Sequence, residues 1–221
     1  MGSPTVAIVD YGMANLRSVQ KALELVGANA VITSRPETVL NSDAVVFPGQ
    51  GAFGDSMKNL RSTGLDEALL EFISSGRPFL GICLGLQLLF EESEEMGHHR
   101  GLGVWPGRVR RFPSNLEITM PDGETRKLKV PHIGWNQVWH DGNNPLLKGV
   151  PNGAYAYFVH SYYVVPKEES LVMCRTDYGI EFVSGCWRDN VWGIQFHPEK
   201  SQAVGRKVLT NFIDIVIGGN S

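Results

Sequence analysis

A cysteine flanked by two glycines constrains this chain more than any other feature, in the segment Gly81-Ile82-Cys83-Leu84-Gly85. The apolar run at residues 79–82 has the length of a buried parallel strand, and residues 84–90 are typical of a helix. The chain therefore turns sharply at Cys83, where glycines allow a close approach that a Cβ would block. This spacing is the cysteine form of the nucleophile elbow, which holds one side chain out above the end of a sheet.

Cys83 has two interpretations. If a helix starts directly after it, the helix dipole and the free N–H groups favour the thiolate, the form that attacks an electrophile. The alternative is a small buried hydrophobe, which is the commonest fate of a free cysteine. The spacing alone is a moderate signal, so the interpretation depends on residues further along the chain.

A histidine and a glutamate near the C-terminus favour the nucleophile. Residues 191–196 indicate another buried strand, which leads into His197-Pro198-Glu199. Side chains two residues apart in an extended chain share a side, and Pro198 restricts the backbone between them. His197 could take the proton of Cys83 while Glu199 holds the imidazole in one tautomer. The alternatives are a surface ion pair and half of a metal site, and because no further ligand lies at suitable spacing we expect no metal.

The glycine-rich segment at residues 48–54 follows another strand, expected at residues 43–47. Its sequence fits neither of the common phosphate-binding glycine motifs. At the carboxyl end of a parallel strand, it would lie on the same sheet edge as Cys83. We therefore expect it to offer backbone N–H groups to an oxyanion, with a phosphate cradle as the alternative.

The order of the segments predicts an α/β fold. Strands at residues 5–9, 30–33 and 43–47 alternate with helices, which predicts a mostly parallel central sheet with helices on both faces. From residue 103 onward, short β segments predict a smaller antiparallel part, with a hairpin turn at residues 121–124 and an irregular loop at residues 131–136. The acidic residues 91–95 are expected to form a solvated helix end. The 221 residues are enough for one domain, expected over residues 4–218.

Composition excludes several classes of protein. The net charge of −3 leaves no basic surface of the kind that binds nucleic acid. No apolar run approaches the roughly 18 residues of a membrane span. The three cysteines, Cys83, Cys174 and Cys186, form no disulfide pattern, which favours a reducing compartment and a cytoplasmic location. We expect Cys174 and Cys186 to lie in the core, and His160 beside Ser161 to be structural rather than a second catalytic pair.

Three segments together carry a resemblance to a known family: residues 48–51 (PGQG), 81–87 (GICLGLQ) and 196–199 (FHPE). In this order they resemble the class I glutamine amidotransferases. The resemblance implies glutamine as substrate, no cofactor, Cys83 as nucleophile, His197 as general acid and base, and Glu199 as its orienting partner. It also implies an oxyanion hole at Gln50 and Leu84, and glutamine contacts at Gly49, Gly51, Gln87, Ser161 and Tyr162.

Within that class, residues 10–19, 131–136 and 196–201 are similar to the glutaminase subunits of imidazole glycerol phosphate synthases, in histidine biosynthesis. This implies a partner in a heterodimer, a (β/α)8 cyclase subunit. The cyclase would receive ammonia through an internal tunnel and make imidazole glycerol phosphate and AICAR. The positions matched to its interface are Asn15, His132, Trp135, Tyr157 and Lys200. The rival hypotheses are a γ-glutamyl hydrolase or cysteine peptidase that acts alone, and a binding subunit without activity.

Overall fold

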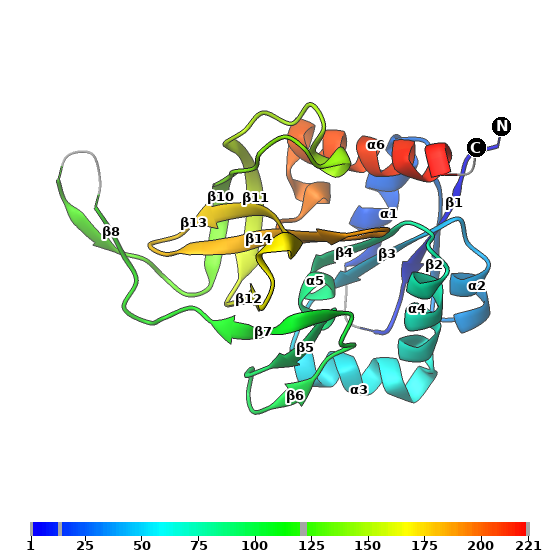
Figure 1. Ribbon diagram of the computed structural model, residues 1–221, viewed down its shortest axis with the longest axis horizontal. Helices are drawn as coiled ribbons and strands as arrows, with labels where there is room; N and C mark the ends of the chain where they lie inside the picture. Colours follow the sequence, from blue (N-terminus) through cyan, green and yellow to red (C-terminus); the bar gives the residue numbers. More distant parts are fainter. Residues whose placement is uncertain (1, 13–14, 120–122, 220–221) are drawn as a thin grey trace.

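Five parallel strands form the centre of the molecule, which the computed structural model describes at residues 2–12, 15–119 and 123–219. In spatial order they are β2 (Asn29–Thr33), β1 (Thr5–Val9), β3 (Ala44–Gly49), β4 (Phe79–Cys83) and β15 (Val191–Ile194) (Figure 1). Parallel strands covered on both faces have short, continuous apolar sequences, as these do. The predicted α/β fold is confirmed.

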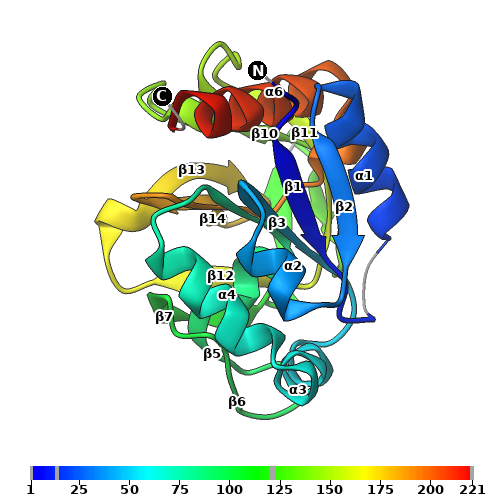
Figure 2. The same ribbon diagram turned by 90° about the vertical axis from the view of Figure 1, so that its right-hand side faces the viewer.

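Helices cover both faces of these strands (Figure 2). One face packs against α1 (Leu16–Leu25) and α6 (Gln202–Gly219). The other packs against α2 (Pro36–Leu40), which was not predicted, α3 (Phe53–Thr63) and α4 (Leu65–Ser74). Each face of the sheet has its own hydrophobic core. Successive residues of β1 contribute to one core and then the other, because successive side chains of a strand point to opposite faces.

Mostly antiparallel strands continue the sheet beyond β15. In order they are β14 (Glu181–Arg188), β12 (Tyr162–Pro166), β7 (Trp105–Arg111), β5 (Phe90–Ser93) and β6 (His99–Arg100), with β13 (Val172–Asp177) paired to β14. Two separate ribbons pair β10 (His132–Val138) with β11 (Ala154–His160), and β8 (Glu117–Thr119) with β9 (Thr125–Lys127). Short 3₁₀ helices occupy Pro145–Leu147, Glu169–Leu171 and Pro198–Lys200.

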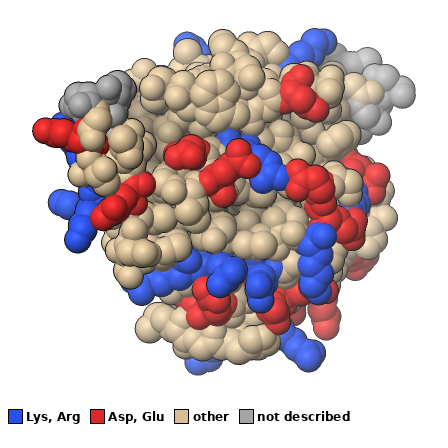
Figure 3. Space-filling view, turned by 60° about the vertical axis from the view of Figure 1, so that its left-hand side comes forward, with Lys and Arg blue, Asp and Glu red and all other residues tan. Residues whose placement is uncertain are grey.

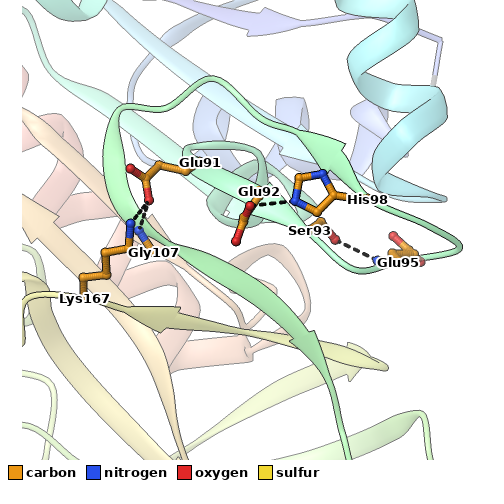
Figure 4. A network of polar contacts seen from close by, with 7 residues as sticks. All are labelled: Glu91, Glu92, Ser93, Glu95, His98, Gly107 and Lys167. Atoms are coloured by element: carbon orange, nitrogen blue, oxygen red, sulfur yellow. Dashed lines mark hydrogen bonds and ion pairs between the residues drawn. The ribbon is translucent and has the colours of Figure 1, made fainter.

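The helix after the elbow is shorter than predicted. α5 (Leu84–Leu88) ends before Phe90, which begins β5, so the expected solvated helix end at the acidic residues is wrong. The Phe90 ring packs 5.7 Å from the Trp105 ring in the core. The next residue, Glu91, accepts a hydrogen bond from the Gly107 N–H (Figure 4). These contacts with residues later in the chain override the local helical preference.

The segment expected as an irregular loop is a regular strand instead. Residues 131–136 lie mostly in β10, whose pairing with β11 places His132 opposite His160 and Trp135 opposite Tyr157. Its aromatic residues therefore alternate between the two faces of a ribbon. Of the hairpin turn expected at residues 121–124, residues 121 and 122 lie outside the described part of the chain.

The surface carries both signs of charge. On the face in Figure 3, Lys and Arg side chains lie beside Asp and Glu side chains. Ion pairs in the antiparallel part include Lys167–Glu91, Arg110–Glu94, Arg175–Glu169 and Arg188–Glu168. In the three described ranges, no helix combines the length and apolar character needed to cross a lipid bilayer.

Candidate active site

The elbow predicted at Cys83 is present. Cys83 ends β4 with φ +57° and ψ −111°, a strained conformation for a residue with a Cβ, and α5 begins at the next residue. A Cβ at Gly81 would lie 2.9 Å from the carbonyl carbon of Gly85, and one at Gly85 would overlap the carbonyl oxygen of Phe47 on β3. Both positions need glycine, because strand and helix meet backbone to backbone.

His197 and Glu199 form a unit beside the elbow, since β15 is the neighbour of β4 in the sheet. His197 Nδ1 donates to Glu199 Oε1 at 2.8 Å, and both side chains are 4% exposed. Nε2 of His197 has no hydrogen-bond partner among the described residues, so it is available for proton transfer. Burial lowers the pKa of His197, but the charge of Cys83 and the contact with Glu199 outweigh burial and raise it. The result is an imidazolium acid beside the sulfur.

A cavity of about 430 Å³ opens between the elbow and the antiparallel strands. Its walls include these residues that were expected at the site: Gln50, Gly51, Cys83, Leu84, Gln87, Ser161, Tyr162 and His197. They come from the turn after β3, from the elbow, from the start of β12 and from the segment after β15. A cysteine at a strained turn, a histidine held by a glutamate and a glycine-containing turn thus meet at one space that fits a small molecule.

Comparison with known proteins identifies the family. The profile of the family "Glutamine amidotransferase class-I" matches residues 7–215. The imidazole glycerol phosphate synthase subunit HisH of Syntrophotalea carbinolica is 54% identical over 210 residues, which cover 95% of this chain and 100% of the relative. The chain belongs to the class I glutamine amidotransferases, in the HisH family. The HisH subunit of Aquifex aeolicus is 52% identical over 206 residues, with coverage of 93% and 94%.

Solved structures of more distant proteins share the fold. A putative GMP synthase component from Thermoplasma acidophilum has a TM-score of 0.72 at 18% identity, and covers 100% of this chain and 97% of its own. PurLQS from Thermotoga maritima has a TM-score of 0.70 at 17% identity, with coverage of 99% and 100%. The resemblance inferred from three motifs is therefore confirmed at the level of family and fold.

In this HisH-family chain, Gly49 lies behind the cavity wall rather than on it. It is buried at the end of β3, opposite Cys83 in the strand pairing. A Cβ at Gly49 would overlap the Tyr11 hydroxyl and lie 2.8 Å from the Leu84 Cβ. The glycine therefore lets the turn after β3 pack against the start of α5, and its contact with glutamine stays a prediction.

Glu95 is a cavity residue that the sequence analysis missed. The Glu95 carboxylate accepts a hydrogen bond from the Phe53 N–H at the start of α3, at 2.8 Å, and its own N–H donates to Ser93 Oγ (Figure 4). Partial burial raises the pKa of Glu95, and the Phe53 N–H opposes that rise. The acidic residues 91–95 do not indicate in sequence which of them lines the cavity, because the path of β5 decides which carboxylate points inward.

Two buried histidines stand beside the cavity. His160 Nδ1 donates to the Tyr162 carbonyl at 2.8 Å, so Nε2 of the neutral ring can only accept. His132 Nδ1 lies 3.1 Å from this Nε2 and is therefore the donor of the second hydrogen bond. Burial lowers the pKa of His132 to about 4 and that of His160 to about 3, so both rings are neutral. The contacts agree with the expectation that His160 is structural, although its ring also forms part of the cavity wall.

The positions matched to the partner interface divide into two groups. Asn15, Trp135 and Lys200 are exposed, Tyr157 is half-buried, and the Lys200 Nζ lies 5.7 Å from the centre of the Tyr157 ring. His132 differs, because its side chain is 3% exposed and stacks 4.0 Å from the Tyr178 ring. The structure corrects the expectation for His132, whose side chain points inward from β10 and packs against Tyr178 instead of facing outward.

Proposed function

We propose that this chain hydrolyses glutamine to glutamate and ammonia at Cys83, as the glutaminase subunit of an imidazole glycerol phosphate synthase. The observation that carries this proposal is that Cys83, at a strained backbone turn, shares one cavity with an unpaired, buried nitrogen of His197. A carboxamide is a poor electrophile, so its cleavage needs a thiolate, a proton donor and an oxyanion site together. The residues of the cavity walls are suited to all three roles.

Glutamine binding would use a charged side chain in the cavity wall, that of Glu95. The half-buried Glu95 is suited to the α-ammonium group, because a carboxylate and an ammonium neutralise each other where water is scarce. We assign the remaining contacts to Gly51, to Gln87 and to the backbone at Ser161 and Tyr162. Held in this way, the side-chain amide would extend toward Cys83.

The chemical steps follow from this placement. The Cys83 thiolate attacks the amide carbon, and the N–H groups of Gln50 and Leu84 stabilise the oxyanion, each by about 3–4 kcal/mol. The protonated Nε2 of His197 then gives its proton to the amide nitrogen, and the C–N bond of the tetrahedral intermediate breaks. Ammonia departs, and the acyl group stays on Cys83 as a γ-glutamyl thioester. His197 then takes a proton from water, whose oxygen attacks the thioester, so that glutamate leaves and the thiolate is restored. Glu199 keeps the imidazole oriented throughout.

A second subunit would receive the ammonia. The outward face of the β10–β11 ribbon exposes large apolar side chains, with Ile133 60%, Trp135 46% and Tyr155 56% exposed. Neighbouring apolar side chains of this size mark an interaction surface. The relatives are named as subunits of imidazole glycerol phosphate synthase, and we infer that the cyclase subunit covers this face. A closed interface would also keep ammonia from becoming protonated in bulk water.

The test is glutamate release from glutamine by the purified chain, alone and with the cyclase and its nucleotide substrate. We expect a large rise in the complex and no turnover by Cys83→Ala or His197→Ala, whereas His98→Ala, at an exposed loop histidine, should match the wild type. Full activity of the chain alone would instead indicate a free hydrolase. Turnover by Cys83→Ala would contradict the proposed nucleophile.

A further inference from the structure

Gln195 connects the nucleophile to a substrate-binding side chain from beneath the cavity. It follows β15, two residues before His197, and its side chain is fully buried. Its Nε2 donates to Cys83 Sγ at 3.5 Å, and its Oε1 accepts from Gln87 Nε2 at 3.0 Å. One carboxamide therefore bridges the sulfur at the elbow and the glutamine of α5.

The orientation of both amides is set by a single carbonyl group. Gln87 Nε2 also donates to the Tyr162 carbonyl oxygen at 3.0 Å, and a carbonyl can only accept. The nitrogen of Gln87 must face that oxygen, so the atom of Gln195 next to this nitrogen must be Oε1. The other end of the Gln195 amide, which faces the sulfur, is then an N–H donor.

This bridge has consequences at both ends. At the sulfur, an N–H donor favours negative charge, while the Val159 carbonyl 3.9 Å away can accept only from the protonated thiol. At the other end, the two N–H groups of Gln87 are engaged by Tyr162 and Gln195. The oxygen is then the part of the Gln87 amide that remains for a ligand, and because Gln87 lines the cavity, this oxygen could accept from an ammonium group.

We propose that Gln195 is a further functional residue of the glutaminase: it donates to the Cys83 thiolate and fixes the Gln87 amide with its oxygen toward the substrate. The proposal rests on the proposed function for the role of Gln87, but its contact with sulfur does not need glutamine. Burial supports the assignment, because a fully buried amide keeps its hydrogen bonds or destabilises the fold. Gln195 thus couples activation of the nucleophile to recognition of the substrate.

The first test is the rate of Cys83 alkylation by iodoacetamide from about pH 5 to about pH 10, read by mass spectrometry of the Cys83 peptide. Methionine in Gln195→Met has a similar length but no hydrogen-bond donor. We expect alkylation of Cys83 near neutral pH to slow about tenfold and the pH midpoint of alkylation to rise, because one hydrogen bond to a charged atom is lost. Gln195→Asn, which is too short for the bridge, should behave alike. The matched control is Ser184→Ala, a fully buried change on the adjacent strand β14 without contact to Cys83.

The second test is glutamine turnover in the complex with the cyclase subunit. Gln195→Met should lower kcat and raise KM, whereas Gln87→Leu should chiefly raise KM. Alkylation of a folded Gln195→Met or Gln195→Asn variant at the wild-type rate and midpoint would overturn the proposal. Absence of turnover by the wild-type complex would refute the proposed function, while a shifted alkylation profile would still support the contact between Gln195 and sulfur.

Discussion

At the residue scale, the site depends on side chains whose roles are set by small differences in burial. The carboxylates of Glu95 and Glu199 illustrate this. Glu199 is 4% exposed and serves the imidazole, while Glu95 is half-buried and reaches the cavity. Both are acids in a chain with a net charge of −3, and only their positions in the fold separate their roles.

Replacement of Glu95 tests its proposed contact with the α-ammonium group of glutamine. Glu95→Gln keeps an oxygen that can accept from the Phe53 N–H, so α3 should stay in place. We expect KM for glutamine to rise about tenfold with little change in kcat, because the lost attraction acts on the bound substrate before and during reaction. Glu92→Gln, at an exposed position that pairs with His98, is the control. An unchanged KM in Glu95→Gln would remove the carboxylate from the binding site.

Replacement of Glu199 tests the support of the imidazole. The charge of Cys83 and the contact with Glu199 both raise the pKa of His197 against burial, so Glu199→Gln, which weakens the second of these, should lower that pKa. Since the protonated imidazole is the acid that releases ammonia, the alkaline limb of the kcat–pH profile should move to lower pH. We also expect kcat to fall about a hundredfold through loss of orientation. An alkaline limb that stays in place would contradict this role.

At the element scale, the strand-to-helix turn is the most constrained part of the fold. The spacing of Gly81 and Gly85 around Cys83 predicted the tight turn. The close backbone contacts at both positions explain why the turn requires glycine. The length of α5 was not predicted, because the apolar residues after Leu88 have the same local pattern in a helix and in a buried strand. Pairing of Phe90 with Trp105 decided between the two, and such a contact is invisible in a local window.

Gly85→Ala should disrupt the elbow. The new Cβ would overlap the Phe47 carbonyl oxygen on β3, so α5 must move away from the strand. We expect a loss of about 1–3 kcal/mol in the free energy of unfolding, measured by urea denaturation, and loss of most activity as Leu84 shifts. Gly218→Ala is the control, because a Cβ there meets no atom of the described structure within 4 Å. Wild-type activity in Gly85→Ala would show that the close approach is dispensable.

At the scale of the whole molecule, the cavity lies where the parallel and antiparallel parts of the sheet meet. The parallel strands contribute the turn after β3, the elbow and the segment with His197, which could be predicted because carboxyl ends of parallel strands share one edge. The opposite wall comes from β12 and from Glu95. The sequence alone offered no route to Glu95, since its position depends on how β5 pairs with β7.

The buried histidines should make the stability of the molecule depend on pH. His132 and His160 have pKa values of about 4 and about 3 in the folded chain, below the ordinary 6.5 of the unfolded chain. Between the folded and the unfolded pKa values, these two histidines bind more protons in the unfolded chain than in the folded chain. Their contribution to the free energy of unfolding therefore decreases as the pH falls below about 6.5. From about pH 7 to about pH 5.5, each histidine should remove about 1 kcal/mol from the free energy of unfolding.

Urea denaturation at the two pH values, compared between the wild type and His160→Asn, measures this contribution. Asparagine can keep a donor for the Tyr162 carbonyl but does not titrate, so the variant should lose about 1 kcal/mol less on acidification than the wild type. His98→Asn, at an exposed histidine, is the matched control. The same loss in His160→Asn and in the wild type would refute the assignment.

The central claim is that Cys83 forms a γ-glutamyl thioester, and its most direct test is to trap that species. The complex with the cyclase and its nucleotide substrate is mixed with isotopically labelled glutamine, quenched in acid, digested and examined by mass spectrometry. We predict labelled glutamyl on the Cys83 peptide, absent from the peptides of Cys174 and Cys186, whose thiols have pKa values raised by burial. The account would be contradicted if labelled glutamate were released without any adduct on Cys83 and the Cys83→Ala variant released it as well.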